Sequence, residues 1–331
     1  MLRELLATIR AKIPASFPIK CYLYIMQNQP VLITVIGPTA IGKTALAIRL
    51  ANHFGCSIIS CDSRQFFKEM TIGTAVPSPE ELQAAAHHFI QHLSIADPYS
   101  VGDFESEALA KLEALFQENP IQIMVGGSGL YVDAVLKGLD HFPEIDPSIR
   151  EAINTRYDQE GLGYLQTELQ RLDPDYYQKI SSENPQTLQN PQRMKRFVEV
   201  SLGTGQPYST FLGKKEGVRP FRSIVIGLEA ERNLLYDRIN QRVDLMVANG
   251  LLKEVTELYP QRALNALQTV GYRELFDFLD AKVSLDEAIE NIKMNTRRFA
   301  KRQMTWFKRT ENVLWFPFDT NFATLLKELH L

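Results

Sequence analysis

Residues 37–44 place glycine, lysine and threonine at the spacing of a phosphate-binding loop. The pattern G-x-x-x-x-G-K-[ST] is fitted by Gly37-Pro38-Thr39-Ala40-Ile41-Gly42-Lys43-Thr44. In such a loop, backbone N–H groups and a helix N-terminus face an anion, Lys43 would neutralise phosphate oxygens, and the Thr44 hydroxyl would hold Mg²⁺. ATP-binding and other nucleotide-binding proteins share this motif. It therefore predicts a diphosphate or triphosphate ligand without identifying ATP.

Two more polar residues follow strand-like runs. Asp62 ends the run that begins at Cys56, and its carboxylate could bind Mg²⁺ through water, accept a proton, or only form a turn. The run that begins at Ile121 ends in Gly126-Gly127-Ser128-Gly129, where many ATPases with this loop carry an acid. This glycine turn indicates either a Ser128 hydroxyl aimed at phosphate or a tight turn before a helix.

A basic run lies near the C-terminus. Residues 291–310 carry cations and no acid: Lys293, Arg297, Arg298, Lys301, Arg302, Lys308 and Arg309. A mainly apolar seam recurs at three- and four-residue spacing and can pack on the core: Ile289, Ile292, Thr296, Phe299, Gln303 and Trp306. The cations must then project from the other faces. Beside a phosphate loop, this surface favours nucleic-acid backbone binding over simple solvation.

Two polar clusters and three histidines are further candidates. Residues 190–196 look like the start of a helix. There, Gln192 and Arg193 could form hydrogen bonds with a base edge, or they could only cap the helix and face solvent. A glycine turn, an aromatic ring and a cation, which suit stacking and phosphate contact, occur together in Gln268-Thr269-Val270-Gly271-Tyr272-Arg273. We interpret His87, His88 and His92 as core or surface residues and not as a metal site. Their spacing does not suit metal ligands, and no cysteine ligand is near.

The elements that must position these residues alternate along the chain. Strand-like runs cover residues 31–36, 56–62, 121–127, 222–228 and 313–316, and helical patterns cover 79–88, 101–117 and most of 230–310. The alternation predicts an α/β fold, a P-loop NTPase-like parallel sheet flanked by helices, with ligands at the carboxyl ends of the strands. Charged-faced helices over 140–215 predict an inserted all-helical subdomain, which leaves 31–139 and 216–331 as the core.

Composition limits the class of protein. The chain has 331 residues, 45% of them hydrophobic, and a net charge of −3, so it can bury a large core and is not coated in positive charge. Its three cysteines, Cys21, Cys56 and Cys61, form no C-x-x-C pair, which predicts free thiols in a reducing cytoplasm. No run approaches the roughly eighteen apolar residues of a membrane span. Residues 1–30 read as an N-terminal extension, disordered or preceding the working start at Met26.

With these residues in order, the chain resembles the tRNA dimethylallyltransferase (tRNA isopentenyltransferase) family, bacterial type, from residue 31 to 316. Beside the phosphate loop, the landmarks are Asp62-Ser63-Arg64-Gln65, Met70-Thr71-Ile72-Gly73-Thr74-Ala75, Tyr99 to Phe104, Val125 to Tyr131, Asn190 to Arg193, Val270 to Arg273 and Thr296 to Trp306. Only the phosphate loop is generic, whereas the order and spacing of the whole set are highly specific.

The resemblance implies transfer of a dimethylallyl group from dimethylallyl diphosphate to the exocyclic amine of the adenine just 3′ of the anticodon. The acceptors would be tRNAs that read codons beginning with U, and the products N6-dimethylallyladenosine and diphosphate. The leaving diphosphate would be stabilised by Mg²⁺, Lys43, backbone N–H groups, Ser128 and Arg242, while Asp62 accepts the proton of the attacking amine. The adenine would be flipped into a channel that opens opposite the diphosphate.

The resemblance also implies tRNA contacts, made by the anticodon arm with the insertion and the basic helix of a monomeric protein. The residues implied are Asp62, Ser63, Arg64, Gln65, Ser128, Arg150, Gln192, Arg193, Gln268, Thr269, Val270, Gly271, Tyr272, Arg273, Arg297, Arg298, Lys301 and Arg302. Two features depart from the family: Ser128 replaces the commoner threonine, and Phe66-Phe67-Lys68 stands where relatives carry a small or valine-like residue and a tyrosine. The phenylalanines bear on the fit around the base or the prenyl tail.

Three other functions compete with this one. A small-molecule kinase would use the loop for ATP. The missing acid after the third strand argues against it, and a small acceptor would not need the basic helix. A prenyltransferase acting on free adenine nucleotides would not need the basic helix or the cluster of Gln192 and Arg193. A non-catalytic tRNA-binding protein would not need Lys43, Thr44 and Asp62 together.

Overall fold

The structure is a computed structural model that describes residues 29–213 and 218–331. The extension expected at residues 1–30 therefore lies almost wholly outside the described residues, as does Cys21. The described chain divides into two compact units, one made of residues 29–136 and Arg219–Leu331 and the other of Lys137–Val218. The second unit falls where the sequence predicts an insertion over residues 140–215.

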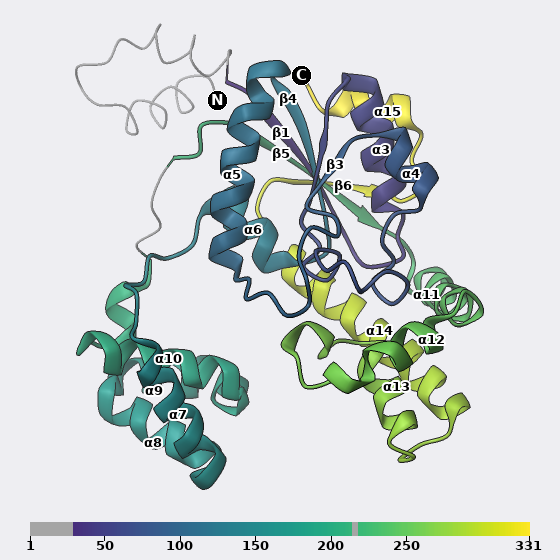
Figure 1. Ribbon diagram of the computed structural model, residues 1–331. Helices are drawn as coiled ribbons and strands as arrows, with labels where there is room; N and C mark the ends of the chain where they lie inside the picture. Colours follow the sequence, from purple (N-terminus) through teal and green to yellow (C-terminus); the bar gives the residue numbers. More distant parts are fainter. Residues whose placement is uncertain (1–28, 214–217) are drawn as a thin grey trace, which may run out of the picture. The chain divides into compact units, whose positions relative to one another are not determined.

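The first unit is built on a parallel sheet with helices on both faces (Figure 1). Its strands are β1 (Val31–Ile36), β2 (Ile58–Ser60), β3 (His87–His88), β4 (Ile121–Val125), β5 (Arg222–Glu229) and β6 (Val313–Pro317). Its helices are α3 (Lys43–Phe54), α4 (Pro79–Ala84), α5 (Val101–Glu118), α6 (Gly129–Lys137), α11 (Arg232–Ala248), α12 (Leu251–Leu258), α13 (Tyr272–Leu279), α14 (Leu285–Phe307) and α15 (Phe322–Glu328).

The strands lie in the order β3-β2-β4-β1-β5-β6, and all neighbours run parallel. In the central strand, Val31 pairs with Ile121 of β4 on one side and with Arg222 of β5 on the other. Both faces of β1 are buried, because α3 and α15 cover one face and α5 and α6 cover the other (Figure 1). The predicted parallel α/β sheet is confirmed.

Side chains of β1 alternate between the two cores, as the two-residue period of a strand requires. Ile33 and Val35 pack in the cluster that contains Leu50 of α3, whereas Leu32 and Ile36 pack in the cluster that contains Phe104 of α5. These residues have no measurable exposure. The alternation therefore assigns each of these β1 side chains to one of the two cores.

One predicted element is wrong. The sequence predicts a helix over residues 79–88, but α4 ends at Ala84, and His87 and His88 form the edge strand β3 against Ile58 and Ile59. The helix begins correctly, because Ser78 and Glu81 form a capping box. It ends early because the backbone at Ala85 is extended. A strand of two residues shows no alternation that a sequence pattern could detect.

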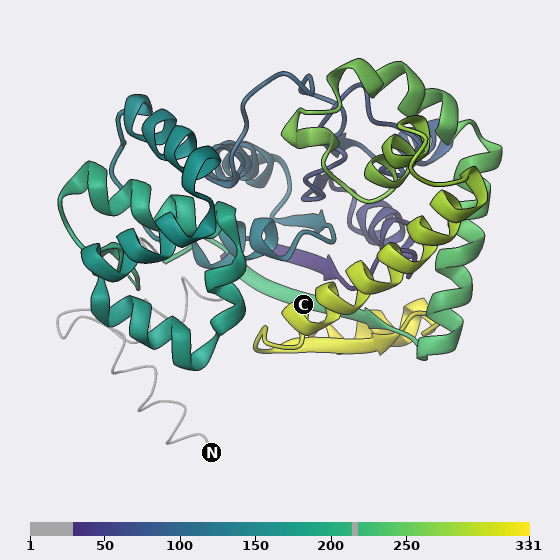
Figure 2. The same cartoon turned by 90° about the horizontal axis from the view of Figure 1, so that it is seen from below.

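Beyond the carboxyl ends of the strands, α11 to α14 surround a third core that contains Leu251, Tyr272 and Ile292. Figure 2 shows α14, in yellow-green, crossing beside the green α11. Polar side-chain contacts join this pair of helices. Lys293 pairs with Asp244 at 2.8 Å, and Arg297 donates to Asn240 at 2.7 Å.

The second unit is helical and has its own core. Its α-helices are α7 (Pro147–Glu160), α8 (Leu162–Leu172), α9 (Pro174–Glu183) and α10 (Pro191–Thr204), with short 3₁₀ turns at Pro185–Gln189 and Tyr208–Phe211. Leu165, Leu169, Met194 and Val198 are fully buried in it. Among the described residues of the whole chain, no helix is both long and apolar enough to cross a membrane.

Candidate active site

The phosphate loop joins β1 to α3, and two of its glycines are required by geometry. Gly37 has a φ of +145°, and a Cβ there would lie 2.7 Å from the backbone oxygen of Leu228. Gly42 caps α3 with a φ of +104°, which side-chain-bearing residues rarely adopt. The chain can therefore turn sharply enough to present the N-terminus of α3 toward an anion.

Lys43 follows this turn as the first residue of α3. Its ammonium donates to the backbone oxygen of Pro38 at 2.8 Å and lies in the field of Asp62. Desolvation by burial lowers the pKa of Lys43 to about 8, and the attraction of Asp62 only partly opposes this shift. A buried cation at the N-terminus of a helix is suited to bind a phosphate group.

A cavity of about 530 Å³ opens beside the loop. We call it the loop cavity. Its polar lining comes from the phosphate loop and the start of α3, from β2 and the segment that follows it, from α4 with its cap and β3, and from α11. These residues are Thr39, Lys43, Thr44, Ser60, Asp62, Gln65, Thr74, Ser78, Glu81, His87, Arg238, Gln241 and Arg242. Cations and backbone donors thus meet hydroxyl and carboxylate oxygens in one space, as a diphosphate with a hard cation requires.

A second cavity of about 420 Å³ adjoins it. We call it the helix cavity, because the α14 residues Ile292, Thr296, Phe299, Arg302, Gln303 and Trp306 form much of its wall. Ser63, Arg64, Ser128, Arg273 and the segment from Gln268 to Gly271 also line it. Four residues line both cavities: Thr39, Asp62, Thr74 and Arg242. The side chain expected to act as the base therefore stands where the two spaces meet.

The buried amide of Gln303 ties α14 to the loop. Its Oε1 accepts from the backbone N–H of Thr39 at 2.8 Å, and its Nε2 donates to the backbone oxygen of Gly127 at 2.9 Å. Ser128, next in the glycine turn, lies 3.1 Å from both the backbone N and the hydroxyl of Ser63. Through these contacts, the Ser128 hydroxyl orders the turn after Asp62. Ser128 lines the helix cavity and not the loop cavity.

Glu254 of α12 holds the segment that leads to Thr74. Its carboxylate accepts from the backbone N–H groups of Thr71, Ile72 and Gly73 at 2.7 to 3.0 Å and from the hydroxyl of Tyr272 at 2.6 Å. Tyr272 has no exposed surface, and burial together with Glu254 raises its pKa. Stacking of Tyr272 on a base is therefore ruled out in this structure, which corrects the expectation from the sequence.

Other expected tRNA contacts have internal partners. The Arg64 guanidinium donates to the backbone oxygens of Asn265 and Ala266, and desolvation lowers its pKa. The Gln65 amide donates to the backbone oxygens of Thr74 and Ala75, and it lines the loop cavity. These two side chains shape the walls of the cavities, although Arg64 still reaches the helix cavity.

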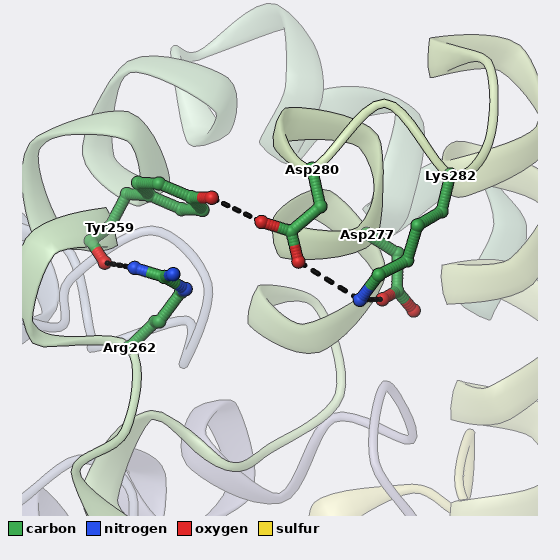
Figure 3. Close-up of polar contacts among 5 residues, drawn as sticks. All are labelled: Tyr259, Arg262, Asp277, Asp280 and Lys282. Atoms are coloured by element: carbon green, nitrogen blue, oxygen red, sulfur yellow. Dashed lines mark hydrogen bonds and ion pairs between the residues drawn. The ribbon is translucent and has the colours of Figure 1, made fainter.

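A polar cluster joins the turn that precedes residues 268–273 to the end of α13 (Figure 3). Tyr259 donates to Asp280, while Lys282 pairs with Asp277 at 3.0 Å and with Asp280 at 2.9 Å. Arg262 lies with its guanidinium carbon 4.2 Å from the centre of the Tyr259 ring. Gln268 and Arg273, which follow this turn, are exposed and line the helix cavity.

The cations of α14 are not equivalent. Arg298, Lys301 and Arg302 are exposed, whereas Lys293 and Arg297 are engaged with α11. The expected seam is only partly a packing face. Ile292 and Gln303 are buried, but Phe299 is 37% exposed and faces the helix cavity. The three-and-four spacing identified the face of the helix correctly, but it did not distinguish a core from a cavity wall.

The remaining expected contacts belong to the second unit. Gln192 and Arg193 are exposed in the first turn of α10, where Asn190 caps the helix by accepting from the backbone N–H of Arg193 at 3.1 Å. Arg150 pairs with buried Glu199 at 2.8 Å, although its side chain stays 63% exposed. The helix start predicted at Pro191 is confirmed, and the cap is supplied by Asn190.

Several lining residues escaped the sequence patterns. Arg238, one helical turn before Arg242, donates to the backbone oxygen of Ala40 at 2.8 Å and lines the loop cavity. Thr74 lies in the landmark segment Met70 to Ala75, which assigns it no role, and Glu254, which lines neither cavity, belongs to no motif. The i, i+4 spacing of Arg238 and Arg242 on α11 is the one signal that could have been used. Phe66 and Phe67, by contrast, are core residues that line neither cavity.

Oxygen donors at the loop cavity fit Mg²⁺. Thr44, Ser60 and Asp62 line it together, and Mg²⁺ is held by few protein oxygens when substrate phosphates and water complete its shell. Within the described ranges, no group of three or more histidine, cysteine or acidic side chains could hold a metal by itself. His87 lines the loop cavity, and desolvation by burial lowers its pKa, which favours the neutral ring.

The sheet order, the phosphate loop and the adjoining basic cavity define a P-loop type of protein with a site suited to a phosphate-bearing ligand. The IPP transferase family model matches residues 65–310, and the chain belongs to this family. It is therefore a prenyl-transferring enzyme.

Individual relatives agree. A tRNA dimethylallyltransferase of Flavobacterium psychrophilum is 65% identical over 299 residues, which is 90% of this chain and 97% of that protein. The crystal structure of the tRNA isopentenylpyrophosphate transferase of Bacillus halodurans has 35% identity and a TM-score of 0.66, covering 91% of this chain and 95% of that one. A eukaryotic dimethylallyltransferase acting on tRNA shares the fold, with 24% identity, a TM-score of 0.76, and coverage of 90% and 77%.

Proposed function

We propose that this enzyme transfers the dimethylallyl group of dimethylallyl diphosphate to the exocyclic amine of the adenine 3′ of the anticodon. The acceptors are tRNAs that read codons beginning with U. The observation that carries the proposal is the placement of Asp62, which lines both the loop cavity and the helix cavity. A donor in one cavity and an adenine in the other would meet at this carboxylate.

The donor occupies the loop cavity. Lys43, Arg242 and the N-terminus of α3 bind the diphosphate, because buried cations and free N–H groups recognise phosphate oxygens. As the bond between the allylic carbon and the bridging oxygen breaks, negative charge grows on the diphosphate, and these groups stabilise it. Arg238 reaches the same cavity and adds a further cation.

The acceptor adenine enters the helix cavity after it has been flipped out of the anticodon loop. Its N6 attacks the allylic carbon, so that the new carbon–nitrogen bond forms as the carbon–oxygen bond breaks. Asp62 takes the proton that N6 loses, which leaves a neutral secondary amine. Exposed Arg273, Arg298, Lys301 and Arg302 contact the phosphates of the RNA.

Mg²⁺ completes the donor site in this proposal. Thr44 would hold the ion, with Ser60 and Asp62 within the same lining, and the ion would supply charge to the diphosphate oxygens. The backbone N–H groups of the loop orient the diphosphate.

The proposal places one chain with one tRNA in the cytoplasm. Cys56 and Cys61 are free thiols, which supports a reducing compartment.

A pair of labelling reactions tests the function. Purified protein and bulk tRNA are incubated with Mg²⁺ and either dimethylallyl diphosphate labelled in its carbon chain or ATP labelled at the γ-phosphate. Label from the allylic donor should appear in tRNA, in a nucleoside that comigrates with N6-dimethylallyladenosine. Transfer of label from ATP, with none from the allylic donor, would instead establish a kinase. Free adenosine monophosphate as acceptor distinguishes the enzyme from one that acts on nucleotides.

A further inference from the structure

Phe299 is an aromatic residue that does not pack in a hydrophobic core. It is 37% exposed on α14 and belongs to none of the hydrophobic clusters formed by residues 29–213 and 218–331. Its ring instead lines the helix cavity. An aromatic ring that lines a cavity and packs in no core suits a ligand with an apolar face.

The charges around Phe299 specify the chemistry of that ligand. Arg298, Lys301 and Arg302 are exposed neighbours on the same helix, and the Arg302 guanidinium carbon lies 5.7 Å from the centre of the Phe299 ring. Arg273 lines the same cavity from α13. A flat apolar surface among cations matches a nucleobase attached to a phosphate backbone, because bases stack on aromatic and guanidinium planes while phosphates pair with the cations.

The position of Phe299 within the cavity specifies which base it meets. Asp62, Thr39 and buried Gln303 form the inner wall, where the reacting amine must lie. Phe299 and Arg302 are the exposed α14 residues of the lining, so they stand at the entrance. An adenine that reaches Asp62 has passed this entrance, and the base next to it along the strand remains outside.

We propose that Phe299 stacks on the nucleobase adjacent to the modified adenine and thereby holds the RNA with that adenine turned inward. The proposal rests on the proposed function, because it requires an RNA acceptor. It makes Phe299 a positioning residue of the acceptor site. Sequence periodicity assigned the same side chain to packing.

A cycle of protein and RNA changes tests the contact. The variants are Phe299→Ala, Phe299→Leu, which keeps apolar bulk without an aromatic face, and Phe299→Trp, which keeps the face. Leu234→Ala serves as the control, because Leu234 is 43% exposed on α11 and lines neither cavity. Each protein is assayed with a synthetic anticodon stem-loop, either intact or carrying an abasic nucleotide on the 5′ or the 3′ side of the adenine. Thermal unfolding verifies that each variant folds.

With intact RNA, Phe299→Ala should raise the KM for RNA about 5- to 100-fold and change the KM for dimethylallyl diphosphate less than about twofold. Phe299→Trp should retain the wild-type value, and Phe299→Leu should lie between. With one of the two abasic RNAs, wild type and Phe299→Ala should become equal. An unchanged KM for intact RNA, or a penalty that persists with both abasic RNAs, would overturn the proposal. Failure of the wild-type protein to prenylate intact RNA would instead overturn the proposed function.

Discussion

The side-chain amide of Gln303 accepts a hydrogen bond from the backbone N–H of Thr39 at 2.8 Å. The two residues are 264 positions apart in the chain. Thr39 belongs to the phosphate loop and Gln303 to the basic helix, so one buried amide joins the donor side of the site to the acceptor side. Its second hydrogen bond, to the backbone oxygen of Gly127, includes the glycine turn in the same connection.

Gln303→Ala should destabilise the protein by about 2 kcal/mol, because it leaves a buried N–H and a buried C=O without partners. Gln303→Glu keeps an acceptor for Thr39 but places a carboxylate against the Gly127 oxygen, so it should be no more stable than the alanine variant. Urea unfolding measures both. Wild-type stability of either variant would show that water replaces the amide at no cost.

Asp62→Ala and Asp62→Asn should lower kcat by about 10²- to 10⁴-fold, because they remove the group that accepts the proton of the attacking amine. The Kd for tRNA should stay within a few-fold of wild type. Single-turnover transfer and filter binding separate the two quantities. Loss of tRNA binding equal to the loss of rate would reassign Asp62 from base to RNA anchor.

Glu254→Ala should cost about 2 kcal/mol of stability, because three backbone N–H groups and the Tyr272 hydroxyl lose a charged acceptor. It should also raise the KM of both substrates, since Thr74 lines both cavities. Glu257→Ala is the matched control on the same helix, because the Glu257 side chain is 66% exposed and its contact with Lys253 is long, at 3.9 Å. Similar losses for both variants would argue against a specific clamp.

The affinity for the diphosphate should fall as pH rises through about 8, because burial lowers the pKa of Lys43 to about that value. Below this pH the ammonium is charged and pairs with phosphate, and above it the free enzyme holds a neutral amine. The profile of kcat/KM for dimethylallyl diphosphate reports the free enzyme and should show this limb. Titration of the enzyme with inorganic diphosphate gives a second readout. A flat profile up to pH 9.5 would mean that Lys43 keeps its proton.

Replacing Arg298, Lys301 and Arg302 together with glutamine should weaken tRNA binding and reduce the slope of log K against log salt by about 2. Arg297→Gln should change that slope less, because Asn240 holds its guanidinium and the Tyr236 ring lies 5.8 Å below it. Binding measured from low to moderate salt tests both variants. Equal slopes for the triple variant and wild type would remove these cations from the RNA interface.

Some features of the fold and of the site follow from local sequence rules. The phosphate loop and the parallel strands follow local rules: glycine alone fits the turn at Gly42, and strand runs such as Val31–Ile36 are apolar throughout. The position of Asp62 at a strand end follows from the same rules, because parallel strands deliver their carboxyl ends to one edge. The order and spacing of the motifs were specific enough to imply the family.

Tertiary structure decided what no local pattern encodes. Tyr272 and Phe299 are both aromatic residues near cations, yet one is fully buried against Glu254 and the other lines a cavity. Likewise Arg297 is engaged by α11 while Arg298 is exposed. Burial and hydrogen-bond partners depend on which distant segments meet. Local patterns therefore specified the phosphate loop and the types of residue around it, whereas packing decided which side chains remain available to a ligand.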